Sequence, residues 1–526
     1  MLKYELSSVL PNGELFELAG AAELSTGETR VVLSLPESTL LRVAAELPVA
    51  HTADTKVFMN GYQTWTYCPE YSMTDRIRGL DHLPRFGVRR FSLDRYGDYH
   101  FIPYTARRGQ THGFSWCCFR DGAQCRLFAS LDERPGYTVF RYDAESAILS
   151  LERDCTGLDV SGEFHAFDLF TASGTEDEVY DAWFAAMNIR PRTTQRLAGY
   201  SSWYNRYQNI SDADLLRDLD GCRAILSPGD MFQIDDGWEC AVGDWLDVDA
   251  AKLPRGMRAL TDDIHAAGFR AGLWLAPFVC QRDSRLAREH PDWLYTVDGE
   301  PWLNGCNWGG FYSLDIDKPA VQDYLARCFE RVFAEWDFDL VKLDFLYGAA
   351  PFGNSHETRA ARMYRALELL RQWCGDRLIL GCGVPVMPAF GLVDYCRVSC
   401  DVGLDWDDNI LMRQLHRERV STRQAIGNTI SRRALNGRAY MSDPDVFFLR
   451  EDNLRLTPAQ KDMLMRVNAL LGGVLFISDD PGKYDAKQRE NYSLARKLFL
   501  AENVHYDPAR NEISYDLDGE KCIWKL

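Results

Sequence analysis

The chain has 526 residues, of which 46% are hydrophobic and 26% are charged, a composition typical of a globular protein with a large buried core. Its 59 basic and 77 acidic side chains give a net charge of −18, which disfavours nucleic-acid partners because an acidic chain repels phosphate polymers. No apolar run is long enough to span a membrane, and the N-terminal segment has no continuous apolar stretch, so we expect neither a membrane span nor a secretory signal.

The fifteen cysteines are odd in number, contain no C-x-x-C motif and are scattered through apolar runs. This pattern favours buried free thiols in a reducing compartment over disulfides or a metal site, and it predicts a cytoplasmic protein. The ten histidines form no H-x-H or H-E-x-x-H motif, so we expect no metal and no other cofactor.

Residues 1–190 are predicted to form β structure. Short runs rich in β-branched and aromatic residues alternate with Asp-Gly, Pro-Gly and Thr-Gly turns over this region. Such spacing is typical of an antiparallel β-sandwich, which we predict as the N-terminal domain.

Residues 191–484 instead alternate short apolar runs with long amphipathic helices. Eight strand–helix repeats of this kind predict an α/β fold, a (β/α)₈ TIM barrel. The alternative is a doubly wound open sheet, but no G-x-G-x-x-G motif follows the first strand. The candidate strands span about 197–203, 230–235, 269–276, 339–345, 377–383, 394–400, 437–442 and 473–478.

Residues 485–526 are too few for a further sandwich. The strand-like runs NEISYD and KCIWKL flank Leu-Asp-Gly-Glu, which is a hairpin signal. We therefore predict a small C-terminal β element.

Acidic side chains follow the predicted barrel strands, at the rim where barrel enzymes place their catalytic groups. Asp344 stands two residues after Lys342, so both side chains point to one face and the ammonium favours an ionised carboxylate. A structural Lys–Asp ion pair is the alternative. Asp401 stands four residues after Arg397, and the two share a face if that strand is regular.

Cleavage of a glycosidic bond needs two carboxyl groups on either side of a sugar. One attacks the anomeric carbon, and the other protonates the leaving oxygen and then activates water. We therefore predict Asp344 and Asp401 as the catalytic pair. In a retaining enzyme such carboxyl groups lie about 5–5.5 Å apart.

Three further acids follow the last two predicted strands. Asp443 is ambiguous between a site residue and a loop anchor. Asp479 and Asp480 are expected to cap the turn that precedes Pro481.

Several motifs together resemble the α-galactosidases of glycoside hydrolase family 36. Those in the predicted barrel stand in the order Ile234-Asp235-Asp236-Gly237-Trp238, Lys342-x-Asp344 and Arg397-x-x-x-Asp401. The segment Asn60-Gly61-Tyr62-Gln63-Thr64-Trp65 resembles one that these enzymes carry in their N-terminal β domain. The similarity runs from about residue 58 to 480. It implies a retaining α-galactosidase, built from an N-terminal sandwich, a catalytic barrel and a C-terminal β domain.

The resemblance also implies roles for individual residues. Asp344 corresponds to the nucleophile and Asp401 to the general acid/base. The positions that correspond to galactose-binding residues are Asp235 and Asp236 on the O4 and O6 side, Lys342 on the O3/O4 side, Arg397 near O2, Trp203, Trp274 and Cys382 in the pocket lining, and Trp65 at the mouth. For Asp236, N-capping of the following turn is the alternative reading of the same motif.

The chain also departs from the family pattern. It is short for the family, and it has Lys-Leu-Asp-Phe-Leu where many members have Lys-Trp-Asp-Met-Asn. An α-galactosyl transferase, an α-N-acetylgalactosaminidase or another retaining α-glycosidase would use the same two acids. A non-catalytic sugar-binding protein and a metal-dependent hydrolase are alternatives of other classes. The expected partner is a small carbohydrate, and the resemblance is compatible with a homo-oligomer.

Overall fold

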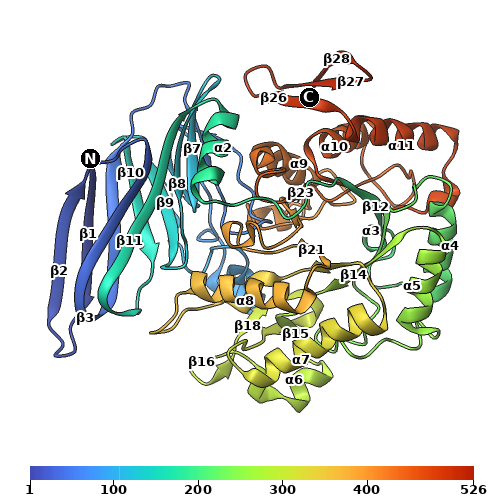
Figure 1. Cartoon of the computed structure of the whole chain (residues 1–526), viewed down its shortest axis with the longest axis horizontal. Coiled ribbons are helices and arrows are strands. Elements are labelled where there is room, and N and C mark those ends of the chain that lie inside the picture. The colour runs from blue at the N-terminus through green and yellow to red at the C-terminus, as the bar shows by residue number, and fades with distance from the viewer. Residues whose placement is uncertain (106) are drawn as a thin grey trace.

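The computed structural model describes residues 1–105 and 107–526. Within these residues, an antiparallel sheet of eleven strands lies beside a parallel sheet of nine strands, and a three-stranded sheet follows near the C-terminus (Figure 1). The predicted fold class is confirmed: an N-terminal β-sandwich, a TIM barrel and a small C-terminal β element. The domain boundaries after residues 190 and 484 stay predictions.

The N-terminal sheet is built around two long strands that run antiparallel to each other, β3 and β11. Its strand order is β5-β4-β7-β8-β11-β3-β10-β9-β6, and β1 and β2 add to β3. The strands are β1 (Leu2–Val9), β2 (Leu15–Ala22), β3 (Gly27–Pro48), β4 (Lys56–Met59), β5 (Glu70–Ser72), β6 (Gln110–Phe114), β7 (Trp116–Asp121), β8 (Gln124–Ser130), β9 (Tyr137–Asp143), β10 (Ile148–Asp154) and β11 (Asp159–Gly174).

Strand β7 shows how the sandwich joins the barrel. Successive side chains of a strand point to opposite faces. Cys117 and Phe119 therefore enter the sandwich core, whereas Trp116 and Cys118 enter the core that is shared with the barrel. Helix α2 (Glu176–Ala186) packs on this second face, where the Trp116 indole donates a hydrogen bond of 3.0 Å to the Tyr180 hydroxyl. Burial on both faces explains why this strand is apolar at its first four positions.

The barrel strands are parallel and follow one another around the ring in chain order. Each overlaps one of the eight predicted strands. They are β12 (Leu197–Ser201), β13 (Met231–Ile234), β14 (Arg270–Leu275), β20 (Leu340–Leu343), β21 (Leu378–Gly381), β22 (Tyr395–Arg397), β23 (Met441–Asp443) and β25 (Val474–Ile477).

The ring closes through a seventh strand that is bent into two parts. Strand β23 pairs with β22, and the next segment, β24 (Val446–Phe447), pairs with β25. Between the two parts, Pro444 has no N–H to donate and Asp445 adopts a φ of 77°. The predicted span 437–442 began four residues early and overlapped only the first part of this strand.

Helices surround the barrel, and short strands extend its loops. The longer helices are α4 (Asp212–Cys222), α5 (Gly256–Ala266), α7 (Pro319–Glu330), α8 (Arg359–Cys374), α9 (Thr422–Ser431), α10 (Pro458–Leu471) and α11 (Ala486–Phe499). In the described chain the fifth repeat has a 3₁₀ turn, η6 (Met387–Ala389), where we expected a helix. The loop additions are α1 (Arg85–Arg90), η1 (Leu93–Arg95), α3 (Trp203–Arg206), β15 (Val279–Gln281), α6 (Arg285–Glu289), β16 (Thr296–Val297), β17 (Glu300–Pro301), β18 (Leu303–Gly305), η3 (Asn307–Gly309), β19 (Phe311–Ser313) and η7 (Met412–Leu415).

The C-terminal segment combines a helix with the predicted hairpin. We expected β structure from residue 485, but this segment begins with helix α11 and reaches its strands only afterwards, at β26 (Glu502–Asp507), β27 (Glu512–Leu517) and β28 (Glu520–Lys525). The β27–β28 hairpin turns at Asp518 and Gly519, whose φ angles of 52° and 82° suit a two-residue turn. None of the described helices is both long and apolar enough to cross a membrane.

Arg432 joins the N-terminal domain to the barrel. It is buried, and its guanidinium donates to the backbone oxygens of Gln63, Thr64 and Val398 and to the side-chain oxygen of Asn60. Three of these acceptors belong to the segment that carries Trp65, so this one side chain fixes that segment against the barrel.

We expect Arg432→Ala to lower the stability of the protein by about 3 kcal/mol or more, because several buried acceptors would lose their donor. The midpoint of thermal unfolding measures the effect. The matched control is Arg258→Ala, which removes an exposed guanidinium paired with Asp262 and should change stability by no more than about 0.5 kcal/mol. Equal midpoints for the two variants would contradict the role given to Arg432.

Candidate active site

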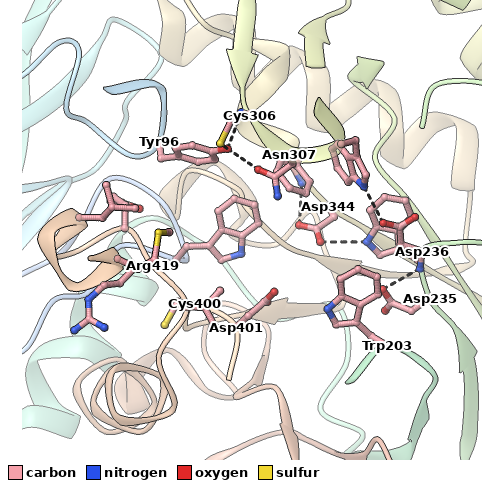
Figure 2. Close-up of a pocket in the computed structure, with 18 of the residues that line it drawn as sticks. Tyr96, Trp203, Asp235, Asp236, Cys306, Asn307, Asp344, Cys400, Asp401 and Arg419 are labelled. Carbon is pink, nitrogen blue, oxygen red and sulfur yellow. Dashed lines mark hydrogen bonds between the residues drawn. The ribbon is translucent and has the colours of Figure 1, made fainter. Parts of the chain in front are cut away.

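A cavity of about 350 Å³ opens at the carboxyl ends of the barrel strands (Figure 2). Eight of the ten residues proposed from the sequence line it, and Arg397 and Cys382 are buried behind its wall. The eight are Trp65, Trp203, Asp235, Asp236, Trp274, Lys342, Asp344 and Asp401. The side chains that were predicted at separate strand ends therefore meet in one place.

Asp344 follows strand β20 and is only 8% exposed. The Trp274 indole donates to its Oδ2 at 3.1 Å, and the Phe345 backbone N–H donates to its Oδ1 at 2.9 Å. Phe345 has a φ of 52°, a left-handed backbone that a large side chain rarely adopts. This turn and the two donors hold the carboxylate in one orientation, directed into the cavity.

Burial raises the pKa of Asp344, the Lys342 charge opposes that shift and the Asp401 charge adds to it. Cys382 and Trp274 lower the pKa by hydrogen bonding. The expected effect of Lys342 is therefore present, but burial outweighs it.

Lys342 forms its ion pair with Asp235 rather than with Asp344. Its ammonium lies 2.9 Å from Asp235 Oδ2, which Gln233 also contacts at 2.7 Å. Burial opposes the charge on Lys342, but the Asp235 carboxylate more than compensates and raises the pKa of the lysine. The alternative of a structural Lys342–Asp344 ion pair is therefore not realised: the lysine pairs with Asp235, which follows strand β13 on the far side of β14.

Asp236 accepts hydrogen bonds from side chains and does not cap the following turn. Gln208 Nε2 lies 3.0 Å from each of its oxygens, and the Trp308 indole donates to Oδ2 at 3.0 Å. The buried Glu239 is also hydrogen-bonded to it. Burial raises the pKa of Glu239 well above its ordinary value, and the Asp236 charge raises it further. Burial and the Asp236 charge thus both favour the neutral form of the Glu239 carboxyl group.

Arg397, at the end of strand β22, contacts three carboxylates. Its guanidinium nitrogens lie 2.7 Å from Asp401, 3.1 Å from Asp443 and 2.9 Å from Asp445. The expected proximity of Arg397 and Asp401 is present, although the strand ends before residue 401. Asp443, ambiguous in the sequence, is a partner of this arginine.

Asp445 was missed by the sequence analysis. Besides Arg397, it accepts hydrogen bonds from the Tyr204 hydroxyl and the Val402 backbone N–H. Burial raises its pKa to about 7, and the nearby charges of Asp401 and Asp443 contribute while Arg397 opposes. The signal in the sequence was the Asp443-Pro444-Asp445 motif, in which proline bends the strand and turns the second acid inward.

The two acids after strand β25 have different roles. Asp480 caps the turn as expected, since its Oδ1 accepts the Gly482 N–H at 3.2 Å. Asp479 does not. It pairs with Arg450 at 2.9 Å and accepts the backbone N–H of Leu449, so it anchors the loop after β24.

The N-terminal domain supplies one wall of the cavity through Trp65. Its indole donates to Cys382 Sγ at 3.3 Å and packs edge-on against Phe345. Gly383 permits this approach, because a Cβ built there would lie 2.7 Å from the Trp65 ring. Trp65 therefore lies directly beside the turn that orients Asp344.

Loop residues that the sequence analysis did not single out complete the mouth. Tyr96, after η1 of the N-terminal domain, hydrogen-bonds Asn307 and accepts the Cys306 N–H, and all three line the cavity. Trp308 of the same loop and Met412 of η7 are also cavity residues. These residues lie in loops and short 3₁₀ turns, which have no regular period, so no sequence pattern pointed to them.

Glu418 is a further cavity residue that the sequence analysis missed. Thr66 Oγ1 donates to one of its oxygens at 2.6 Å and Gln63 Nε2 donates to the other at 3.3 Å. Burial raises its pKa from the ordinary 4.5 to about 7, and Asp98 contributes while the Thr66 hydrogen bond and the Arg417 charge oppose. Across the described residues, no group of three or more His, Cys, Asp or Glu side chains is arranged to hold a metal ion.

Comparison with known sequences relates the barrel to one enzyme family. Residues 200–368 match the family model named Melibiase. An alpha-galactosidase of Escherichia coli is 27% identical over 318 residues, which are 57% of this chain and 41% of that protein. Alpha-galactosidase AgaA of Geobacillus stearothermophilus is 31% identical over 191 residues, 35% of this chain and 25% of that protein. The matched regions thus span less than half of these curated relatives.

Solved structures give a broader match. TtGalA, an alpha-galactosidase from Thermus thermophilus in complex with p-nitrophenyl α-D-galactopyranoside, is 27% identical with a TM-score of 0.74, covering 94% of this chain and 98% of that chain. The GH36 alpha-galactosidase AgaA from Geobacillus stearothermophilus is 12% identical with a TM-score of 0.60, covering 98% and 79%, a likeness of fold alone. These matches confirm the resemblance predicted from the motifs.

The buried Glu418 gives a testable dependence of stability on pH. Because its pKa is raised on folding, its contribution to stability is present in full below pH 4.5 and is lost as the pH rises through about 7. We expect Glu418→Gln to remove this loss, so the unfolding midpoint of the wild type should fall relative to that of the variant between pH 5 and 7. Midpoints that run parallel over this interval would show that the carboxyl group does not titrate there.

Proposed function

We propose that this chain, a relative of the melibiase-like α-galactosidases, is a retaining glycoside hydrolase that removes terminal α-linked galactose from oligosaccharides or glycoconjugates. The observation that carries the proposal is the meeting of Asp344 and Asp401, from the ends of the fourth and sixth barrel strands, in one cavity lined by further acids and tryptophans. The likeness to TtGalA, which was solved with a galactoside, supports a galactose-type substrate.

In the proposed reaction Asp344 is the nucleophile. Its carboxylate attacks the anomeric carbon, and a covalent galactosyl–enzyme ester forms as the bond to the leaving oxygen breaks. The donors Trp274 and Phe345 occupy one site on each carboxylate oxygen and fix its direction without neutralising it. Lys342 pairs with Asp235, so its ammonium does not block the attacking oxygen.

Asp401 is the proposed general acid/base. Its side chain is 37% exposed, in contrast to the buried Asp344, so it can contact both a departing sugar and an incoming water molecule. Arg397 holds one of its oxygens at 2.7 Å, which leaves the other directed to the substrate. It first protonates the leaving oxygen and then removes a proton from the water that hydrolyses the ester.

The two acids that follow strand β13 are placed to accept hydrogen bonds from the axial O4 of galactose. Asp235 and Asp236 provide adjacent acceptors that are fixed by Lys342, Gln208 and Trp308. A sugar with an equatorial O4 would leave one of these buried acids poorly paired, at a cost of about 1–3 kcal/mol. Arg397 and Cys382 lie behind the cavity wall, so we propose that they position Asp401 and Trp65 respectively.

Two expectations about the whole chain form part of this proposal. We place the domain boundaries after residues 190 and 484. We also propose a cytoplasmic location, since all fifteen cysteines are free and twelve of them are buried, which suits a reducing compartment.

Product analysis tests the proposed function. We expect release of nitrophenol from the nitrophenyl α-galactoside but not from the α-glucoside or the α-N-acetylgalactosaminide, and release of free galactose from melibiose or raffinose. Dominant transfer of galactose to an added acceptor sugar would instead identify a transferase. Galactose binding without turnover of any of these substrates would identify a sugar-binding protein.

Removal of the nucleophile should abolish turnover on every substrate. We expect Asp344→Asn, which keeps the size of the side chain, to lower kcat/KM by about 10⁴-fold or more for both nitrophenyl galactoside and melibiose. Steady-state rates measure the loss, and galactose binding by calorimetry serves as the control for an intact cavity. Activity within tenfold of the wild type would contradict the assignment.

Removal of the acid/base should affect substrates according to their leaving group. We expect Asp401→Ala to lower kcat/KM by about 10²–10⁴-fold for melibiose and by less for nitrophenyl galactoside, whose leaving group needs no proton. Azide should partly restore turnover of the nitrophenyl substrate by attacking the galactosyl ester, forming galactosyl azide. An equal loss on both substrates without rescue by azide would count against Asp401.

A further inference from the structure

A second cleft lies beside the substrate cavity. The side chains that line it are mostly positively charged, although the chain as a whole is acidic. It has a volume of about 520 Å³, and four arginines line it together with only one acid, Asp407. The chain as a whole carries a net charge of −18. The general acidity of the protein therefore does not account for this cleft, and we call it the basic cleft.

The single acid of the basic cleft, Asp407, already has a guanidinium partner. Arg419 is buried and contacts both oxygens of Asp407. Arg413 and Arg423 form longer ion pairs with Asp407, at 3.8 and 3.7 Å, and their side chains are 51% and 56% exposed. Arg413 Nε also donates to the backbone oxygen of Asp408 at 2.7 Å. Arg78 of the N-terminal domain forms no ion pair with a described residue and is exposed. The lining of this cleft therefore holds four guanidinium groups and one carboxylate, which leaves it with excess positive charge.

Positive charges also surround His416, which lines the same cleft. Burial lowers the pKa of His416 to about 4, and the charges of His82, Arg78 and Arg419 lower it further, while Asp81 opposes. His416 lines the basic cleft, and its ring lies 5.0 Å from that of His82.

We propose that the basic cleft is an oxyanion site, in which Arg78, Arg413 and Arg423 bind a phosphate-type group. Guanidinium groups present paired N–H donors that match the oxygens of a phosphate, and such charge-assisted hydrogen bonds are strong. Trp406 lines the same cleft and provides an aromatic face for a ring attached to that group.

The basic cleft and the substrate cavity share one wall. Met412 and Leu415 line the substrate cavity, whereas Arg413 and His416, which alternate with them along the chain, line the basic cleft. Arg419 lines both, and Figure 2 shows it at the edge of the substrate cavity, beyond Cys400 and Asp401. An anion bound by Arg413 therefore fixes the segment that forms the mouth of the substrate cavity. Binding of an anion in the basic cleft should change the KM for the substrate in that cavity.

Binding of inorganic phosphate tests the site without any need for turnover. Calorimetry at constant ionic strength, with chloride as the reference salt, should show saturable binding to the wild type. In Arg413→Ala/Arg423→Ala the affinity should fall by about tenfold or more for each guanidinium removed. Both side chains are half exposed, so the fold should persist. The control Arg30→Ala/Arg258→Ala removes two exposed arginines elsewhere and should bind like the wild type.

Two results would overturn the site: no saturable binding of phosphate to the wild type, or equal affinity in the Arg413→Ala/Arg423→Ala variant and the control. Because this experiment does not use a galactoside, its outcome is independent of whether the chain hydrolyses one.

Kinetics distinguish whether the anion is a free oxyanion or a group carried by the substrate. This experiment rests on the proposed galactosidase activity. If the site serves a free oxyanion, phosphate should change the KM of neutral nitrophenyl galactoside in the wild type but not in Arg413→Ala/Arg423→Ala. If the anion belongs to the substrate, an α-galactoside with a phosphorylated leaving group should have a lower KM than the neutral one, and the variant should lose this preference. A variant that matches the wild type in both assays would overturn the link to the substrate cavity.

Discussion

The arrangement of acids in the cavity depends on the contacts of one buried cation, Arg397. A guanidinium removed from water is stable only when it is paired, and Arg397 is paired with Asp401, Asp443 and Asp445. Strand β22 ends at Arg397, so sheet hydrogen bonds do not hold Asp401, and the guanidinium does so instead. Lys342 has the equivalent role for Asp235 on the opposite side. Asp344 accepts hydrogen bonds from the neutral donors Trp274 and Phe345, and the Lys342 charge favours its ionised form.

The barrel alone does not complete this cavity. Trp65 from the N-terminal domain packs against the turn that orients Asp344, and Arg432 and Glu418 bind the segment that carries it. The same domain contributes Tyr96 to the mouth and Arg78 to the basic cleft. Movement of the N-terminal domain relative to the barrel would therefore alter both the surroundings of Asp344 and the mouth of the cavity. The buried, hydrogen-bonded contacts between the domain and the barrel oppose such movement.

The fold and most of the candidate site could be predicted because parallel strands impose a regular pattern. Eight apolar runs located the barrel strands, and their ends located Asp235, Asp344 and Arg397. Contacts across strands were not predictable: Lys342 follows the period of its own strand, yet its partner Asp235 follows β13, on the far side of β14. Asp445, Glu239 and Glu418 were missed because a bent strand and loops carry them, and such segments have no period. The helical start of the C-terminal segment was missed because the hairpin signal beyond it dominated the interpretation.

Whether Asp344 forms a covalent bond to galactose is decided most directly by trapping the intermediate. An activated, fluorinated α-galactoside, whose enzyme ester hydrolyses slowly, would be incubated with the protein and the product analysed by intact mass and peptide mapping. Double displacement predicts one fluorogalactosyl group per chain, attached to the peptide that contains Asp344, and no adduct in Asp344→Asn. Turnover of the reagent without any adduct, or an adduct on a different carboxyl group, would contradict the proposed mechanism.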